Sequence, residues 1–243
     1  MKIYLEEVES TNQYIRELCQ KQEELEEGSL VWCRKQTKGR GQVGNSWESE
    51  EDKNLTFSFI LYPEFIHINE QFIISELIAI SILEELNNIA SEFSIKWPND
   101  IYWKNKKIAG ILIENDLIGA QIKQTIIGIG LNVNQTQFVS NAPNPISLKQ
   151  ITGKNFILEE LLDSIMSTIY SKYLQLISDG NEDIHKLYMN NLYRKDNFYT
   201  YRDKNGLFEA KIISVEPSGH LILLDSDQKK RTYAFKEIEY ILQ

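Results

Sequence analysis

Cysteine and histidine are scarce in this chain. Its 243 residues include only two cysteines, Cys19 and Cys33, and three histidines. Two cysteines without paired spacing cannot form a disulfide framework or a zinc site, and they are typical of reduced thiols in a cytosolic protein. The histidines, His67, His185 and His220, lie outside every motif described below. No Ser-His-Asp or Cys-His arrangement for nucleophilic catalysis is therefore apparent.

Long apolar runs and an excess of positive charge are also missing. No apolar run reaches the length of a membrane span, and the N-terminal residues MKIYLEE lack the apolar core of a signal peptide. The net charge is −9, whereas nucleic-acid binders usually present a basic face. We therefore predict a cytoplasmic protein that binds neither DNA nor a membrane. The 42% hydrophobic content is sufficient for a core, and the length suits one large and one small domain.

Helical and strand patterns are mixed along the first 190 residues without βαβ alternation. A helix is expected after Ser10 or Thr11, where Gln13 completes a capping-box pattern. Alternation over 55–61 predicts a half-buried strand, and residues 94–134 are typical of a β-meander with turns at 104–106 and 115–116. Two further helices are expected at about 71–90, with Glu76 outside the apolar stripe, and at 158–177, with Leu174 inside it. This mixture predicts an α+β fold with a mixed, largely antiparallel sheet.

The pattern changes beyond about residue 190. Short strands are separated by turns at 203–206 and 217–219, which predicts a five-stranded, SH3-like β-barrel. We therefore divide the chain into a large domain at 1–190 and a small C-terminal β domain at 191–243.

The segment TKGRGQVGNSW at 37–47 is the most informative part of the chain. Gly39, Gly41 and Gly44 allow backbone N–H groups to turn toward a ligand, while Lys38 and Arg40 add positive charge. This composition predicts a cradle for phosphate or carboxylate. The spacing matches neither a Walker loop nor a Rossmann fingerprint. Alone, the segment is equally compatible with a mobile surface turn.

Three further motifs accompany this segment in a fixed order. They are ESTN at 9–12, KWPND at 96–100 with KIAGILIE at 107–114, and IGIGLNVN at 127–134. Together they resemble the biotin protein ligase family, in its short form without an N-terminal DNA-binding domain, since ESTN begins at residue 9. The resemblance implies the class II synthetase-like fold of biotin and lipoate ligases. It also implies that biotin and ATP form biotinyl-5′-adenylate, with Mg²⁺, and that biotin then passes to a lysine of a biotin carboxyl carrier domain.

The resemblance also implies roles for individual residues. Because a carboxylate meets a triphosphate, the site needs cations and N–H donors, and Lys107 and Arg40 are the expected catalytic residues. Asp100 is the candidate Mg²⁺ ligand. The implied biotin contacts are Ser10, Thr11, Asn12, Gln36, Gly39, Arg40, Lys107 and Gly110. The implied ATP or adenylate contacts are Lys38, Arg40, Gly41, Gln42, Asn45, Trp47, Asn99, Asp100, Lys107 and Asn132.

Several of these residues have purely structural alternatives. Lys107 is also compatible with a solvated strand start, Trp47 with a core residue, and Ser10 with a helix cap. Asn99 and Asp100 suit an Asx-turn, and Asn132 suits a turn that needs a left-handed residue. The commonest family pattern has more arginines in the glycine segment than this chain, which carries Gln42 and Asn45. Retention of the adenylate therefore cannot be inferred from the resemblance.

Two other functions compete with this interpretation. A lipoate or octanoate ligase or transferase shares the fold class, but it lacks these motifs in this form. Biotin is favoured because its ureido ring has two N–H donors and a carbonyl, which require polar partners that a dithiolane does not. A non-catalytic nucleic-acid or peptide module would use the basic residues 229–231 and an aromatic face. That face would comprise Tyr199, Tyr201, Phe208, Tyr233 and Phe235, although such alternation more often forms a core. The sequence is compatible with a monomer or a homodimer.

Overall fold

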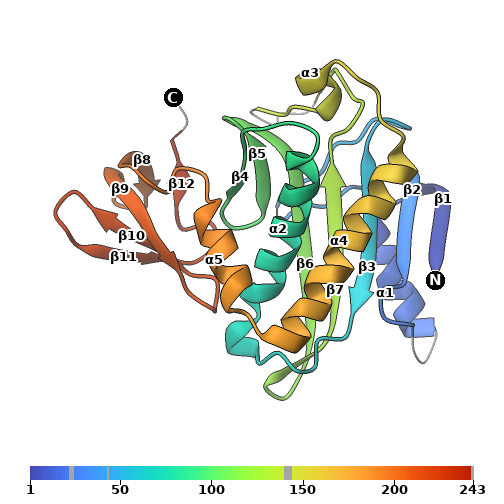
Figure 1. Cartoon of the computed structure of the whole chain (residues 1–243), viewed down its shortest axis with the longest axis horizontal. Helices are drawn as coiled ribbons and strands as arrows, with labels where there is room; N and C mark the ends of the chain where they lie inside the picture. Colours follow the sequence, from blue (N-terminus) through green and yellow to red (C-terminus); the bar gives the residue numbers. More distant parts are fainter. Residues whose placement is uncertain (22–24, 43, 140–143, 242–243) are drawn as a thin grey trace.

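A seven-stranded mixed sheet forms the larger part of the molecule. The computed structural model (Figure 1) describes residues 1–21, 25–42, 44–139 and 144–241, and the strand order is β1-β2-β3-β7-β6-β5-β4. Strands β1 (Lys2–Val8) and β2 (Leu30–Gln36) run parallel, and all other neighbouring pairs are antiparallel. The remaining strands are β3 (Leu55–Leu61), β4 (Phe93–Lys96), β5 (Asp100–Trp103), β6 (Lys106–Ile118) and β7 (Gln121–Leu131). The α+β fold expected from the sequence is confirmed.

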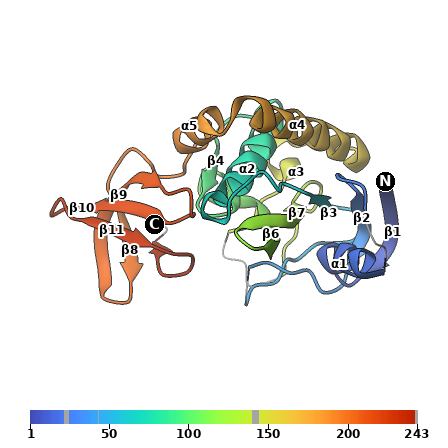
Figure 2. The same ribbon diagram turned by 90° about the horizontal axis from the view of Figure 1, so that it is seen from below.

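Helices cover both faces of this sheet. Helices α2 (Phe72–Asn87), α4 (Leu158–Asp179) and α5 (Glu182–Asn190) lie over one face, while α1 (Thr11–Lys21) packs on the other, against β2, β3 and β7 (Figure 2). All seven residues of β3 are consequently buried, because each face of the strand is covered. The prediction of a half-buried strand was therefore wrong, because the face of β3 expected to be exposed to solvent is also covered.

Helix α2 is buried on more sides than its apolar stripe predicted. Glu76 is only 2% exposed, and its Oε1 lies 2.9 Å from Nδ1 of His185 on α5. Burial raises the pKa of the Glu76 carboxyl, and His185 opposes that shift. The prediction that Glu76 faces away from the core was wrong, because α4 and α5 both pack against α2. Another expectation was wrong in the opposite sense: Leu174 of α4, expected inside the apolar stripe, is 61% exposed, whereas its neighbour Tyr173 is buried.

The long hairpin of β6 and β7 corrects a second expectation. Asn115 and Asp116 do not form a turn but lie within β6, paired with Thr125 and Gln124 of β7. Their side chains find partners across the strands, since Thr125 Oγ1 donates to Asn115 Oδ1 at 2.8 Å and Gln124 Nε2 donates to Asp116 Oδ2 at 2.7 Å. Satisfied polar side chains do not end a strand. The turn is at Gly119, whose φ of +60° favours glycine.

Capping residues define the shorter helices. Ser10 precedes α1, but its Oγ lies 3.5 Å from the Gln13 N–H, and the Gln13 side chain donates to Glu17 instead. The predicted capping box at Ser10 is therefore only half formed. A complete capping box occurs at α3 (Leu148–Thr152), between Ser147 and Gln150. A short 3₁₀ helix, η1 (Ile68–Glu70), leads into α2.

The C-terminal strands form a separate antiparallel sheet with the order β11-β10-β9-β8-β12. This sheet is consistent with the SH3-like domain expected from the sequence. Its strands are β8 (Tyr199–Asp203), β9 (Gly206–Val215), β10 (Leu221–Asp225), β11 (Lys230–Tyr233) and β12 (Glu239–Tyr240).

Its aromatic residues form a core more than a binding face. Tyr201 and Tyr233 are buried, and each stacks on Phe208 with ring centroids 6.1 Å apart. Arg231 is paired with Asp225 at 2.8 Å and lies over the Phe208 ring. Phe235 packs instead against Trp97 of the larger part, with centroids 5.4 Å apart. These contacts disfavour the nucleic-acid module.

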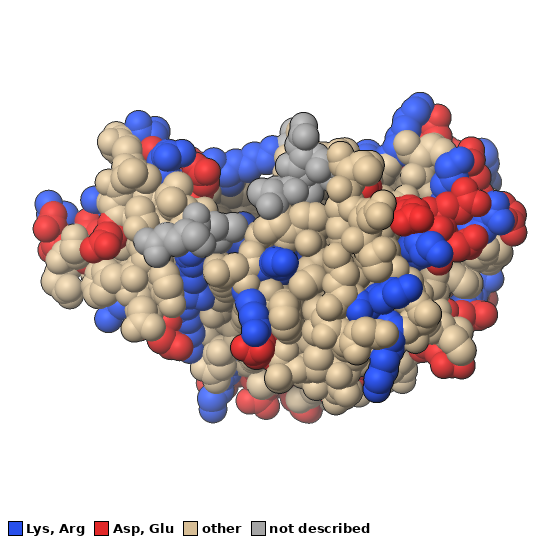
Figure 3. Space-filling model, turned by 90° about the horizontal axis from the view of Figure 1, so that it is seen from above, with Lys and Arg blue, Asp and Glu red and all other residues tan. Residues whose placement is uncertain are grey.

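The charge on one face of the molecule agrees with this conclusion. On the face shown in Figure 3, basic and acidic atoms lie side by side at the right-hand end, and uncharged atoms cover most of the centre. Basic atoms on the described part of this face form separate groups, not one continuous stripe. Among the described helices, none is both long and apolar enough to cross a bilayer.

Candidate active site

A cavity of about 710 Å³ lies between the large sheet and the C-terminal strands. Strands β6 and β7 contribute Gly110, Gly128 and Gly130 to its lining. The start of α1, the glycine-rich segment, residues 96–100 and residues 238–241 supply much of the remaining lining. This volume falls within the usual range of roughly 300–1,000 Å³ for small-molecule sites.

Two glycines of the IGIGLNVN motif allow side chains to approach the sheet closely. A Cβ added at Gly128 would lie 2.1 Å from Asn12 Oδ1, and one at Gly130 would lie 2.2 Å from Trp47 Cε2. Any larger residue would displace these side chains, so glycine is required for packing. The motif therefore seats Asn12 at one end of the cavity and Trp47 near the other.

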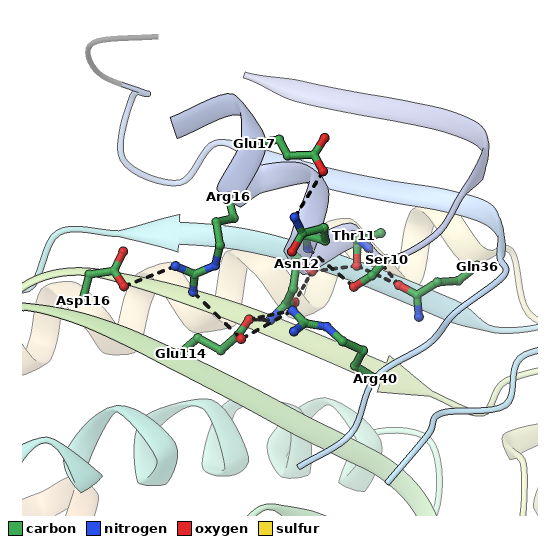
Figure 4. Close-up of polar contacts among 11 residues, drawn as sticks. Ser10, Thr11, Asn12, Arg16, Glu17, Gln36, Arg40, Glu114 and Asp116 are labelled. Carbon is green, nitrogen blue, oxygen red and sulfur yellow. Dashed lines mark hydrogen bonds and ion pairs between the residues drawn. The ribbon is translucent and has the colours of Figure 1, made fainter. Parts of the chain in front are cut away.

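The end of the cavity beneath α1 is neutral and tightly hydrogen-bonded. Gln36 Oε1 accepts from the Thr11 backbone N–H at 2.9 Å and from Thr11 Oγ1 at 3.2 Å. Ser58 of β3 reaches the same cluster, with its Oγ 2.7 Å from Thr11 Oγ1. Ser10, Thr11 and Asn12 are 3–5% exposed (Figure 4). We call Ser10, Thr11, Asn12, Gln36 and Ser58 the neutral end.

A carboxylate joins the neutral end to the glycine-rich segment. Glu114 Oε2 accepts from Asn12 Nδ2 at 2.9 Å and from Arg40 Nη2 at 3.1 Å (Figure 4). Arg16 of α1 lies 3.9 Å from the other oxygen of Glu114 and pairs with Asp116 at 3.3 Å. Arg40 is thus held beside the neutral end, on the edge of the cavity.

The opposite end carries two lysines and one carboxylate. Lys107 Nζ lies 2.6 Å from Asp100 Oδ1 and 5.7 Å from the centroid of the Trp47 ring. Lys96 Nζ lies between two tyrosine rings, 5.2 Å from that of Tyr102 and 5.0 Å from that of Tyr240. Burial lowers the pKa of Lys96, while Asp100 opposes the shift. We call Lys96, Asp100 and Lys107 the charged end, and its excess positive charge suits an anionic ligand.

The glycine-rich segment folds back on itself as a small hairpin. The Trp47 N–H donates to Gly39 O, and the Gly41 N–H donates to Asn45 O, both at 2.9 Å. Arg40 and Ser46 form a β-bridge between these bonds. The hairpin carries Arg40 and Trp47 into the cavity wall, while Val43 lies outside the described residues.

Three residues expected at the site do not line the cavity. Lys38 is 70% exposed and pairs with Glu9 at 2.6 Å. Gly39 serves the hairpin, because a Cβ there would lie 2.3 Å from Trp47 O. Asn132 is buried behind β6, and its Nδ2 donates to Ile146 O at 3.1 Å. Among the described residues, its Oδ1 has no hydrogen-bond partner.

The remaining expected residues come together around the cavity. They are Ser10, Thr11, Asn12, Gln36, Arg40, Gly41, Gln42, Asn45, Trp47, Asn99, Asp100, Lys107 and Gly110. Sequence reasoning missed Lys96, although it begins the KWPND motif. It also missed Arg202, Lys236, Glu239 and Tyr240 of the C-terminal sheet, for which no local pattern points to a ligand.

The described residues offer no preformed cage for a metal ion, since no group of three suitable side chains occurs among them. Asp100 supplies one carboxylate, already paired with Lys107. This arrangement still fits Mg²⁺, which usually takes one or two protein carboxylates and is otherwise held by phosphates and water. The ion would therefore arrive with a nucleotide and would find Asp100 at the charged end.

Comparison with known proteins agrees with this geometry. The model of the biotin/lipoate A/B protein ligase family matches residues 4–132, more than half of the chain. The chain belongs to this family. The bifunctional ligase/repressor BirA of Bacillus subtilis is 29% identical over 238 residues, covering 96% of this chain and 72% of BirA. The biotin–[acetyl-CoA-carboxylase] ligase of Paracoccus denitrificans is 26% identical over 209 residues, covering 82% and 85% of the two chains.

A solved structure gives the same result for the family fold. The biotin protein ligase from Aquifex aeolicus in complex with biotin and ATP superposes with a TM-score of 0.80 and 26% sequence identity. The match covers 98% of this chain and 97% of that one. Both sheets of the present chain therefore fall within the match to this family member.

Proposed function

We propose that this chain is a biotin–protein ligase. It activates biotin with ATP to form biotinyl-5′-adenylate and transfers the biotinyl group to a lysine of a biotin carboxyl carrier domain. The observation that carries the proposal is a single cavity with a neutral, hydrogen-bonding end, a cationic end, and Arg40 between them. One ligand with a polar ring and a carboxylate, and a second with phosphates, match these two ends.

In the first half-reaction, a carboxylate oxygen of biotin attacks the α-phosphorus of ATP, and pyrophosphate leaves. Both reactants are anions, so the protein's main task is to reduce their repulsion with fixed positive charge. Lys107 donates to the phosphate oxygens on which negative charge increases, and Arg40 holds the carboxylate. Lys96 adds a second cation, and no side chain has to accept a proton. When bound, Mg²⁺ supplies further charge neutralisation to the phosphates.

In the second half-reaction, a neutral lysine amine of the carrier attacks the acyl carbon, an amide bond forms, and AMP leaves. A second hollow of about 570 Å³ shares Arg40 and Pro98 with the main cavity and extends to Phe72 and Phe235. This hollow offers a path by which the carrier lysine reaches the acyl carbon. Residues of the C-terminal strands line the main cavity, and residues of the loops between them line the second hollow, which supports a role for this part of the chain in closing the site.

The neutral end favours biotin over lipoate. Ser10, Thr11, Asn12 and Gln36 present several buried polar atoms in a small volume. A ureido ring has donors and an acceptor that can hydrogen-bond with these polar groups, whereas a dithiolane would displace water from them without offering a hydrogen bond in return, which is costly. The acid specificity therefore follows from hydrogen bonding more than from pocket size.

The other features expected from the sequence join this proposal. The ligase domain comprises residues 1–190 and the SH3-like domain comprises 191–243. The protein acts in the cytoplasm, does not bind DNA, and works as a monomer or a homodimer. Sedimentation of the purified chain distinguishes the last two states.

The decisive experiment measures transfer to a carrier. The purified protein is incubated with Mg-ATP, a lysine-bearing carrier domain, and either biotin or lipoate. Intact-mass analysis is expected to show one biotinyl addition per carrier and no lipoyl addition. Lipoyl transfer at a rate equal to biotinyl transfer would contradict the proposed specificity for biotin. No transfer of either acid would contradict the proposed function.

A further inference from the structure

Glu114 occupies a position that the proposed reaction does not yet use. It follows the apolar strand residues of KIAGILIE, and its side chain is 25% exposed. Its two carboxylate oxygens interact with two separate segments (Figure 4). They accept hydrogen bonds from Asn12 of α1 and from Arg40 of the glycine hairpin, and one of them pairs with Arg16 of α1. Within the described part of these segments, no other charged side chain links α1 to the hairpin in the contacts shown. Glu114 therefore connects the neutral end to the cation expected to meet the substrate carboxylate.

The anchor that Glu114 provides is rigid. Asn12 cannot move toward β7, because it already lies against Gly128, and its Oδ1 accepts from Ser58. Arg16 is held from its other side by Asp116, whose second oxygen accepts from Gln124 at 2.7 Å. Glu114 itself projects from β6 in the middle of a long strand pair. A charge fixed in this way can hold a flexible partner in one orientation.

Arg40 is the flexible partner. Its side chain is 42% exposed and has several rotatable bonds, so ordering it costs side-chain entropy. Among the described residues, its side-chain contacts with Glu114 use only Nη2, at 3.1 and 3.4 Å. The donors on Nη1 and Nε remain for another anion, because a guanidinium has five N–H groups in a planar fork.

We propose that Glu114 is a positioning residue that orients Arg40 for the carboxylate of the acid substrate. It holds one end of the guanidinium before the substrate arrives and leaves the other donors directed at the cavity. The inference rests on the proposed function, because it assumes that Arg40 meets the substrate carboxylate. The opposite role would be competition, in which Glu114 occupies Arg40 and must be displaced by the substrate. The two roles predict opposite changes in affinity.

The test compares Glu114→Ala and Glu114→Gln with the wild-type protein. Biotin affinity is measured by calorimetry without ATP, and it is measured again with the neutral alcohol analogue of biotin. Glu114→Ala is expected to weaken biotin binding roughly 3- to 10-fold, as for ordering one long side chain, and to leave the alcohol within about 2-fold. Glu114→Gln keeps the shape and one acceptor oxygen, so its biotin affinity is expected to lie between those of the wild type and Glu114→Ala. Because it is nearly isosteric, it also serves as a control for loss of folding.

Asp116→Asn is the matched control. Asp116 lies two residues away on β6 and contacts Arg16 but not Arg40. Asparagine keeps its shape and an oxygen for Arg16, and the contacts of Glu114 with Asn12 and Arg40 stay intact, so biotin affinity should remain within about 2-fold of wild type. In an Arg40→Ala background, removal of Glu114 should have no further effect on biotin binding, because the two residues act as one unit. A persistent effect there would overturn the inference.

Other outcomes are equally decisive. Tighter binding of biotin by Glu114→Ala would establish competition and overturn positioning. Equal weakening for biotin and its alcohol would show that Glu114 acts on the neutral end through Asn12, again overturning the inference. If the wild-type protein binds neither ligand, the proposed function fails together with this inference. If it binds biotin and Glu114→Ala changes nothing, only this inference fails.

Discussion

The two ends of the cavity are built on different physical principles. At the neutral end, Ser10, Thr11 and Asn12 are 3–5% exposed. The Thr11 backbone N–H donates to Gln36 at 2.9 Å, and Thr11 Oγ1 lies 2.7 Å from Ser58 Oγ. At the charged end, the Lys107 side chain is 32% exposed and that of Asp100 is 16% exposed. Buried neutral groups select a ligand that can hydrogen-bond with them, because a ligand that cannot do so incurs a desolvation penalty. Accessible charges attract any suitable anion, and the electrostatic interaction energy increases when the ligand excludes water from the site.

The two ends also differ in where their residues lie in the chain. The neutral end is assembled from residues 10–58. The charged end combines β4, β5 and β6 with Tyr240 of β12, and so depends on the contact between the two sheets. Under the proposed function, we therefore expect selectivity for the acid to reside in the larger part alone and nucleotide binding to involve both parts of the molecule.

The largest expected effect is at the charged end. Lys107→Ala should fold normally and slow adenylate formation by roughly 10²–10³-fold, as when one preorganised charge donor is lost. Biotin-dependent pyrophosphate exchange measures this rate. Lys106→Ala is the control, because Lys106 is adjacent and exposed. A near-wild-type exchange rate in Lys107→Ala would remove this lysine from the mechanism.

Two glycine substitutions separate the ends directly. Gly128→Ala should displace Asn12, raise the KM for biotin about 10-fold or more, and leave the KM for ATP nearly unchanged. Gly130→Ala should displace Trp47 and show the reverse pattern. Each should also lower stability by about 1–3 kcal/mol through overpacking, which thermal melting measures. Equal changes in the same KM for both variants would show that the ends do not act independently.

Lys96→Met tests the pH dependence of the charged end. Lys96 has a lowered pKa, so in the window between that value and about 10.4 the unfolded chain binds more protons than the folded one. Its contribution to stability therefore rises with pH across this window, while the cation available to phosphates decreases.

Lys96→Met should abolish this rise and raise the KM for ATP roughly 3- to 10-fold near pH 7, less than the loss at Lys107. Denaturant melts and KM measurements from pH 7 to 10 check both effects. An unchanged slope of stability against pH would show that Lys96 titrates as in the unfolded chain.

Ser10→Ala should have the smallest effect. The distance of 3.5 Å from Ser10 Oγ to the Gln13 N–H indicates a weak cap, so we expect a loss near the lower end of the usual range, about 0.5 kcal/mol. Because Ser10 lines the cavity, the KM for biotin should also rise about 2- to 3-fold. A change in melting temperature without a change in KM would make Ser10 a helix cap only.

Local patterns predicted the elements whose environment is local. The strand at 55–61 and the helix near 72–87 follow from period-two and helical spacing, and both occur with nearly the expected bounds. The burial of Glu76 and of both faces of β3 could not be predicted, since each depends on a second layer that arrives from elsewhere in the chain. The continuation of β6 through Asn115 depends in the same way on partners across the hairpin.

The same distinction between local and long-range features applies to the candidate site. The family resemblance carried by the motifs pointed to Arg40, Lys107 and the Ser-Thr-Asn cluster, and the fold brings them to one cavity. It also included Lys38 and Asn132, which point elsewhere because Glu9 and Ile146 hold them. Nothing local indicated that Glu114 would hold Arg40, since 74 residues separate the two.

By itself, the sequence determined the family, the type of the most regular secondary-structure elements, and the chemical groups available for an acid and a nucleotide. These depend on short-range spacing, which the order of residues sets directly. Only the tertiary structure decided which carboxylate neutralises which cation, which lysine is partly desolvated, and which C-terminal residues complete the wall. Those outcomes depend on distances between segments far apart in the chain, and electrostatic and burial energies change steeply with such distances.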